Sequence, residues 1–288
     1  MNAFTYHRPA TLAEAVQLLA GPEARALCGG TDLLVQMKDG RRTPQALVDI
    51  KAIPELQVLE YDAARGLRVG AAVPLAVVCE HPAVCERYPA FHHGANIVGA
   101  IQTRARAGLG GNLCNAAPSA DTAPSLIAYG ATAVIYGPTG RREVPLEQFF
   151  TGPGRTVLGP GELLVEVDVP ALPARSGANY ERHTPRIEMD IAVVGVGSYV
   201  ELAADGTIAV CRIALGAVAP TPVRATSAEQ AVVSQTPGDA LCRRAGELAV
   251  SHARPISDQR GSETFRRQLV ESLTYRTLSR AIEAAQRA

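Results

Sequence analysis

The sequence lacks an excess of charge of either sign. Its 288 residues include 28 Lys and Arg and 28 Asp and Glu, so the formal net charge at neutral pH is zero. Proteins that bind nucleic acids or membrane surfaces usually do so through clustered positive charge. The composition indicates neither class, and we expect no nucleic-acid partner.

A long apolar segment is also missing. No run approaches the ~20 residues that a membrane-spanning helix needs, and LIAYGATAVIYG is short and interrupted by glycine. The first residues, MNAFTYHRPATLAEAVQLLAG, have neither the basic start nor the apolar block of a signal peptide. These features predict a cytoplasmic protein.

Several motifs of common sites are absent. There is no HExxH or GxSxG, so a metalloprotease or hydrolase has no support. GxxxxGK[ST] and GxGxxG do not occur, which argues against the two commonest phosphate-binding loops. No CxxC pair is found among the six cysteines, which we expect to be buried and reduced. We predict no metal ligand and no catalytic residue in this chain.

The first part of the chain alternates helix and strand signals, as in an α/β unit. Thr11 and Glu14 form a capping box at the start of a helix that Gly21 can end. RALCGG and QALVDI read as short strands, and TDLLVQMKDG between them reads as a turn into a helix. Hairpins are predicted around 63–66 and 137–140, and ELLVEVDVP reads as a strand.

The pattern changes after PALPARSGA, the most linker-like segment in the chain. Two strands around an Asp205-Gly206 turn are predicted to pair antiparallel. Helices are expected over roughly 227–252 and 263–287. We therefore place a boundary near residue 176, with one domain over residues 1–176 and a second over residues 177–288.

Two segments between these strands are harder to interpret. Residues 74–102 have helical character, which we expect to be broken at Pro82, Pro89 and Gly94. AGLGGNLCNAAPSADTAPSLIAYGA is expected to be a long loop that leads into a helix.

Two glycine-rich turns stand out, CGGTD at 28–32 and GLGGN at 108–112. Backbone N–H groups at such turns can hold phosphate without a lysine, because glycine tolerates positive φ and has no Cβ to block a close oxygen. Thr31 adds a hydroxyl, and two such turns could hold the two phosphates of one dinucleotide. The alternative is that these glycines only make tight turns and close packing contacts.

The second turn is followed by polar residues in a span too long for a mere connector, namely Asn112, Asn115, Ser119 and Asp121. Asp121 could accept hydrogen bonds from ribose hydroxyls, or it could be the N-cap of a helix that starts at Thr122. Further on, RIEMD places charged residues before a strand, and we interpret it as a solvated edge with local ion pairs.

Taken in order, these stretches resemble the FAD-binding medium subunit of the molybdenum hydroxylases, the family of the carbon monoxide, xanthine and nicotine dehydrogenase flavoproteins. The resemblance covers FTYHRPATLAEAVQLL, GGTDLLVQMK, LVDI, LRVGAAV, GGNLCNAAPSADTAPSLIAYGA, GELLVEVDVP and DIAVVGVG. It implies an α+β fold, with a two-part FAD-binding domain of the vanillyl-alcohol-oxidase (PCMH) type over residues 1–176, in subdomains of about 1–56 and 57–176. A small C-terminal domain of antiparallel sheet and helices would follow.

The resemblance also implies which residues bind FAD. Residues 26–33 would hold the pyrophosphate, with Leu33 near the flavin ring; 108–112 would form a second FAD loop; Asp121 would bind a ribose; and Leu164 would line the flavin pocket. The full implied set is Ala26, Leu27, Cys28, Gly29, Gly30, Thr31, Asp32, Leu33, Gly108, Leu109, Gly110, Gly111, Asn112, Asn115, Asp121, Leu164 and Arg182.

Two positions depart from the family pattern. Gly108 stands where the family usually has Thr or Ser, which removes a hydroxyl from the loop. Arg182 stands where many relatives have a Lys near the flavin. The positive charge, which would stabilise an anionic reduced flavin, is kept with a different geometry.

The function implied is that of an electron-transfer subunit and oxidoreductase. A large subunit would hold a molybdenum-pterin cofactor and a small subunit [2Fe-2S] clusters, as a dimer of heterotrimers. Electrons would leave through FAD to an external acceptor such as NAD, a quinone or a cytochrome. The alternatives are a stand-alone FAD oxidoreductase on the same fold, or a non-catalytic nucleotide-binding scaffold subunit.

Overall fold

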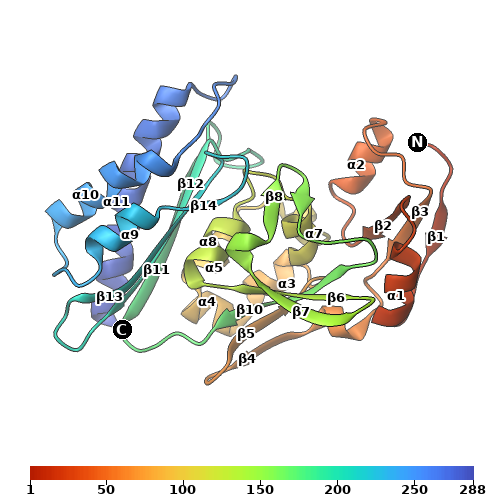
Figure 1. Cartoon of the computed structure of the whole chain (residues 1–288), viewed down its shortest axis with the longest axis horizontal. Coiled ribbons are helices and arrows are strands. Elements are labelled where there is room, and N and C mark those ends of the chain that lie inside the picture. Colours follow the sequence, from red (N-terminus) through yellow and green to blue (C-terminus); the bar gives the residue numbers. More distant parts are fainter.

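The computed structural model describes all residues, 1–288. Its three larger sheets follow one another along the molecule (Figure 1). A three-stranded sheet lies near the N-terminus, a five-stranded sheet lies in the middle, and a four-stranded sheet with three helices lies at the other end. Mixed α and β structure of this kind confirms the predicted α+β class.

The first sheet is parallel, in the order β1-β3-β2. Its elements are β1 (Thr5–His7), α1 (Leu12–Leu19), β2 (Ala24–Leu27), α2 (Leu33–Lys38) and β3 (Ala46–Asp49). The predicted capping box forms in part, since the Thr11 hydroxyl accepts from the Glu14 N–H at 3.2 Å, while the Glu14 carboxylate accepts from the Ala10 N–H. Because parallel strands end at the same edge, the residues after β2 and β3 lie next to each other.

The middle sheet is antiparallel, in the order β4-β5-β10-β6-β7. Its strands are β4 (Leu59–Asp62), β5 (Gly66–Gly70), β6 (Thr132–Gly137), β7 (Gly140–Pro145) and β10 (Leu163–Pro170). Both predicted hairpins are confirmed. Two short strands, β8 (Phe150–Gly152) and β9 (Arg155–Thr156), pair beside it, and short 3-10 turns follow β3 (Pro54–Gln57) and β7 (Leu146–Gln148).

Six helices lie between β5 and β6: α3 (Leu75–Glu80), α4 (Pro82–Arg87), α5 (Pro89–Asn96), α6 (Ile101–Arg104), α7 (Leu109–Cys114) and α8 (Thr122–Tyr129). The breaks at Pro82 and Pro89 are confirmed, but the one at Gly94 is wrong. Gly94 lies inside α5, where a Cβ would come within 2.8 Å of the Asp121 carbonyl oxygen, so glycine is required there by packing. The expected loop is also wrong over 109–114, which forms α7.

The C-terminal sheet is antiparallel, in the order β11-β12-β13-β14, and the predicted pair around Asp205-Gly206 is confirmed. Its strands are β11 (Ser176–His183), β12 (Val194–Leu202), β13 (Ile208–Gly216) and β14 (Val223–Arg224). The first predicted helix is two, α9 (Thr226–Val232) and α10 (Asp239–Ala249), because SQTPG between them carries a proline and a glycine. A 3-10 turn (Val250–His252) and α11 (Glu263–Arg287) complete the chain.

The C-terminal sheet is covered on both faces. Helix α11 packs on β11 and β12, while α5 and α8 from the preceding part contact the same sheet. The large hydrophobic core of the first two sheets accordingly extends into β11, β12 and β13 through residues such as Tyr180 and Tyr199. The predicted boundary after residue 176 falls at the first residue of β11, and the division into domains stays a prediction.

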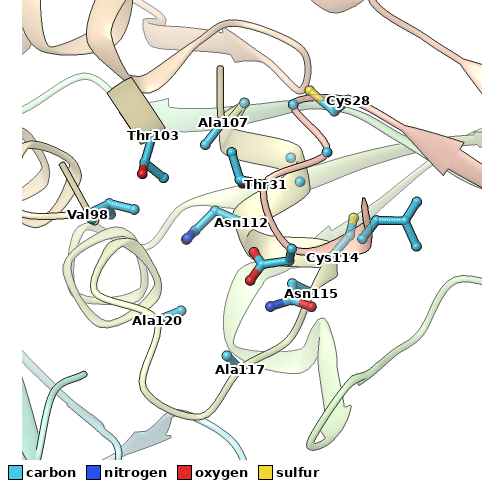
Figure 2. A pocket seen from close by; sticks show the side chains of 18 of the residues that line it. Cys28, Thr31, Val98, Thr103, Ala107, Asn112, Cys114, Asn115, Ala117 and Ala120 are labelled. Carbon is cyan, nitrogen blue, oxygen red and sulfur yellow. The ribbon is translucent and has the colours of Figure 1, made fainter. Parts of the chain in front are cut away.

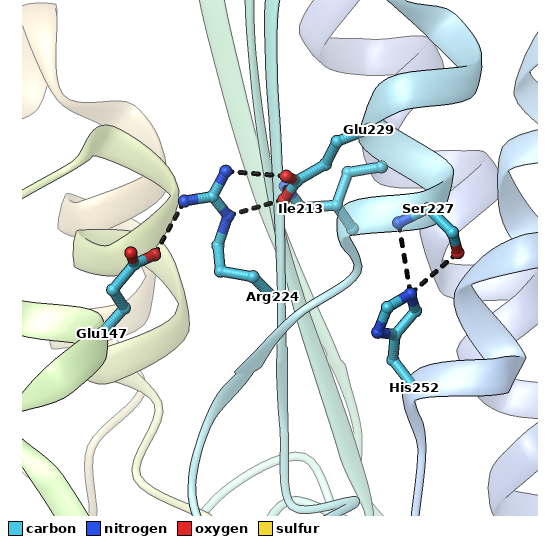
Figure 3. A network of polar contacts seen from close by, with 6 residues as sticks. All are labelled: Glu147, Ile213, Arg224, Ser227, Glu229 and His252. Carbon is cyan, nitrogen blue, oxygen red and sulfur yellow. Dashed lines mark hydrogen bonds and ion pairs between the residues drawn. The ribbon is translucent and has the colours of Figure 1, made fainter.

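Arg224 joins the two parts through ion pairs (Figure 3). Its Nη1 is 2.7 Å from Glu147 Oε2, next to the middle sheet, and its Nε is 2.6 Å from Glu229 Oε1 on α9. Glu229 Oε1 also accepts from the Ile213 N–H at 2.8 Å.

None of the helices combines the length and the apolar character that a bilayer span needs.

Candidate functional site

A cavity of about 660 Å³ opens where three distant segments of the chain meet (Figure 2). One wall is the turn that follows β2, and the second runs from the end of α5 through α7 to the start of α8. Residues 189–191, between β11 and β12, close the third side. The two glycine turns, which are about eighty residues apart in the sequence, therefore line one space.

The structure brings together almost the whole predicted set. The lining includes Ala26, Leu27, Cys28, Gly29, Gly30, Thr31, Asp32, Leu33, Gly108, Gly110, Gly111, Asn112, Asn115, Asp121 and Leu164. Two predicted residues do not line the cavity. Leu109 is fully buried in the core, and its N–H donates to the Val73 carbonyl. Arg182 forms an ion pair with Asp121 and is not among the lining residues.

Three of the glycines serve close packing of the protein on itself. A Cβ at Gly29 would lie 2.1 Å from the Arg106 carbonyl oxygen, and one at Gly110 would lie 2.4 Å from Ala71 Cβ. A Cβ at Gly108 would lie 2.4 Å from Cys28 Sγ. The packing interpretation therefore applies to these positions, and at Gly108 an added Cβ would also lie 2.8 Å from the Ala71 carbonyl oxygen.

The other two glycines are different. Gly30 has φ of +71°, a conformation that glycine adopts at little cost. At Gly111, a Cβ would meet only Cys28 Cβ, at the ordinary contact distance of 3.6 Å, so the space beside it is open. A Cβ at Gly30 would press on Leu34 Cδ1 at 2.9 Å and on Leu27 Cδ1 at 3.1 Å, so of the five glycines only Gly111 has room beside its Cα.

Backbone N–H groups along the first turn have no acceptor in the protein. From Gly29 to Leu33 none of them donates a hydrogen bond to backbone, whereas the Gly30 and Asp32 carbonyls accept from Leu34 and Gln36 at the start of α2. The Gly111 N–H in α7 likewise has no backbone acceptor. Successive N–H groups of this kind form a nest that suits an anion.

Asp121 is held from the C-terminal sheet. Tyr180 and Arg182 are two apart on β11, so their side chains lie on the same face of the strand. The Tyr180 hydroxyl donates to Asp121 Oδ1 at 2.8 Å, and the Arg182 guanidinium pairs with Oδ2. Asp121 does occupy the N-cap position of α8, which starts at Thr122 as predicted, but its carboxylate makes no capping hydrogen bond to the helix. Burial raises the pKa of Asp121 to about 6, although Arg182 and Tyr180 oppose the shift.

The asparagines add polar groups to the same wall. Asn112 Oδ1 accepts from the Thr122 hydroxyl at 2.6 Å, which leaves its amide nitrogen as a donor directed toward the cavity (Figure 2). Asn115 Oδ1 accepts from Gln36 Nε2 at 3.4 Å, which joins α2 to the end of α7. The cavity thus offers donors from both glycine turns.

Comparison with known proteins identifies this arrangement. A family model described as the FAD binding domain in molybdopterin dehydrogenase matches residues 2–172, and the CO dehydrogenase flavoprotein C-terminal domain matches residues 180–281. The chain belongs to this family of FAD-binding dehydrogenase subunits. It is accordingly a flavoprotein and part of an oxidoreductase, with FAD as its cofactor.

Individual relatives match over nearly the full chain. The putative xanthine dehydrogenase FAD-binding subunit of Escherichia coli K12 is 35% identical over 283 residues, which are 98% of this chain and 97% of the relative. The carbon monoxide dehydrogenase medium chain of Hydrogenophaga pseudoflava is 32% identical over 280 residues, which are 96% of this chain and 96% of the relative. A chain of the solved carbon monoxide dehydrogenase from that organism superposes with a TM-score of 0.93, at 33% identity and 98% coverage of both chains.

The FAD-binding family pattern did not reveal the third wall. Met189, Asp190 and Ile191 line the cavity, although RIEMD was interpreted only as a solvated edge. The ion-pair part of that interpretation is confirmed, since Arg186 Nε lies 3.5 Å from Asp190 Oδ2. Met189 and Ile191 remain 56% and 48% exposed, and no local motif in the sequence marks them as residues of the cavity.

Proposed function

We propose that the cavity holds FAD, with its pyrophosphate on the N–H groups of residues 29–33 and Gly111. The observation that carries this proposal is that these N–H groups border the cavity and donate to no backbone acceptor. Gly111 leaves room for phosphate oxygens, and no lysine is needed because the donors are backbone amides. The Thr31 hydroxyl and the Asn112 amide would add donors.

The two ends of the cofactor have candidate partners as well. Asp121 borders the cavity, and its oxygens retain lone pairs after accepting from Tyr180 and Arg182, so it would accept from ribose hydroxyls. Leu33 and Leu164 would contact the flavin end, together with Ile191 from the third wall. Arg182 would act through Asp121, because its guanidinium is committed to that carboxylate.

We further propose that the chain is the electron-transfer subunit of a heteromeric molybdenum hydroxylase. When bound, FAD can accept electrons from one centre and pass them to another. The chain would position it between [2Fe-2S] clusters of a small subunit and an external acceptor, with the molybdenum-pterin cofactor in a large subunit. Relatives named as medium chains, and one named as the alpha subunit of a 6-hydroxypseudooxynicotine dehydrogenase complex, support this assignment.

The first experiment is a visible spectrum of the purified chain, with mass spectrometry of the cofactor that heat releases. We expect FAD at about one per chain. The second mixes the FAD-loaded chain with a chemically reduced small subunit and follows flavin absorbance. Bleaching that requires the small subunit supports the electron-transfer role. A chain that turns over an organic substrate without partners would instead favour the stand-alone oxidoreductase, and a chain that refuses FAD would favour the scaffold.

The assembly and location belong to the same proposal. We expect a dimer of heterotrimers in the cytoplasm, and light scattering of the purified complex gives a mass that distinguishes it from a single heterotrimer. A mass of one heterotrimer would contradict the proposed assembly without affecting the FAD site.

A further inference from the structure

Lys51 lies just outside the cavity and contacts the first glycine turn from behind. It follows β3 and is one of only two lysines in the chain, the other being Lys38. Its Nζ donates to the Cys28 carbonyl oxygen at 3.0 Å and lies 2.8 Å from Asp49 Oδ1. Lys51 does not line the cavity, so its ammonium meets the turn and not a ligand.

Asp49 and Tyr6 hold Lys51 in turn. Asp49 is only 5% exposed; it accepts from the Lys51 N–H at 3.0 Å, and the Tyr6 hydroxyl donates to its other oxygen. Burial favours the neutral acid, but the hydrogen bonds from Lys51 and Tyr6 prevail and lower the pKa of Asp49. The three residues therefore link β1 and the end of β3 to the turn that follows β2.

This link sets the direction of the first peptide units of the turn. The Ile50 N–H donates to the Leu27 carbonyl at 3.1 Å, so two successive carbonyls, those of Leu27 and Cys28, are held by the end of β3. Because the peptide unit is planar and trans, its N–H points opposite to its C=O. Fixing the Cys28 carbonyl on Lys51 therefore directs the Gly29 N–H away from Lys51 and fixes where the following residues of the turn begin.

We propose that Lys51, held by Asp49 and Tyr6, is a positioning residue that orients the turn at residues 28–33 for a pyrophosphate group. The inference rests on the proposed FAD site and deepens it. The positive charge of Lys51 is paired with the carboxylate of Asp49, so the contribution is mainly geometric: the donors of the turn are set before the ligand arrives, and less conformational freedom is lost on binding.

The test compares Lys51→Met with Lys51→Arg and with the matched control Lys38→Met. Methionine keeps a long unbranched side chain without a donor, arginine keeps a donor, and Lys38 is exposed at the end of α2. The deflavinated chain is titrated with FAD, with ADP and with riboflavin, which lacks phosphate. For Lys51→Met we expect about tenfold weaker binding of FAD and of ADP, because one charge-assisted hydrogen bond is lost. Riboflavin binding should be unchanged, Lys51→Arg should restore most of the affinity, and Lys38→Met should behave like the wild type.

Two outcomes overturn the inference. One is unchanged FAD and ADP binding in Lys51→Met; the other is a loss for riboflavin as large as for FAD, which would show a general structural role. If Lys51→Met does not fold, Tyr6→Phe replaces it, since Tyr6 is half exposed and loses only its bond to Asp49. It should weaken ADP binding in the same direction, and unchanged ADP binding would overturn the inference. If the wild-type chain binds neither FAD nor ADP, the proposed FAD site itself is contradicted. If the wild type binds both and the Lys51 variant binds them equally well, only the role of Lys51 is contradicted.

Discussion

The carboxylate of Asp121 and the guanidinium of Arg182 form an ion pair in which the side chains are only 8% and 6% exposed. Asp121 stands at the start of α8, on the cavity wall, while Arg182 lies on β11 of the C-terminal sheet. The C-terminal sheet thereby fixes a residue of the cofactor cavity. Such a pair gains little over apolar packing, but removing one partner leaves a buried charge alone.

Arg182→Met should destabilise the chain because it leaves the buried Asp121 carboxylate without its cation. Near pH 8, we expect the free energy of unfolding to fall by about 3 kcal/mol, the typical cost of breaking a buried pair from one side. Urea denaturation of the deflavinated chain measures this loss. Arg182→Lys keeps the charge and is the control. If Arg182→Lys loses as much unfolding free energy as Arg182→Met, the geometry of the guanidinium matters and not its charge.

The pH dependence of stability should carry the signature of Asp121. Burial raises the pKa of this carboxyl to about 6 in the folded chain, above the value near 4 in unfolded chains. Between these values the folded state binds more protons, so the contribution of Asp121 to stability is present below about pH 4 and is lost as the pH rises to about 6. Asp121→Asn cannot titrate. Its stability relative to the wild type should therefore rise through that window by roughly 2–3 kcal/mol, and a constant difference would contradict the raised pKa.

Two neighbouring glycines in α7 should respond in opposite ways to the same substitution. Gly111→Ala places a methyl group in open space and should leave the fold intact or slightly more stable, because alanine favours helix. The same methyl group would occupy the place of a phosphate oxygen, and we expect FAD binding to weaken about tenfold, or about 1.4 kcal/mol. Gly110→Ala, the matched variant, pushes against Ala71 and should cost about 1–3 kcal/mol of stability. Unfolding and FAD titration of both variants measure the two effects, and normal FAD affinity in Gly111→Ala would contradict the proposed placement.

The comparison of sequence and structure separates local signals from tertiary ones. The capping residue Thr11, the hairpins and the Asp205-Gly206 turn could be predicted because a few adjacent residues determine them. The helix α7 could not, since LGGN has poor helix propensity and folds there because Gly110 packs on Ala71. The same holds for Gly94 in α5, which close contact with α8 requires.

The candidate site shows the same division. Both glycine turns could be found as short motifs, and the resemblance to a family put them in one cavity. The sequence alone could not show that Gly29, Gly108 and Gly110 serve close packing, that Gly30 has a positive φ, or that Gly111 has space beside it. These roles depend on the tertiary structure around each Cα. The contribution of residues 189–191 depends likewise on how the C-terminal sheet packs against α5 and α8.

The central claim is that the N–H groups of residues 29–33 and Gly111 receive the pyrophosphate of FAD. Hydrogen–deuterium exchange of the deflavinated chain, with and without ADP or FAD, measures these groups directly. Without ligand they have no backbone acceptor and should exchange rapidly. We predict that both ligands slow exchange in peptides that cover residues 28–34 and 108–112, and that riboflavin does not. If FAD binds and the exchange rates of both segments stay unchanged, the proposed position of the pyrophosphate is wrong.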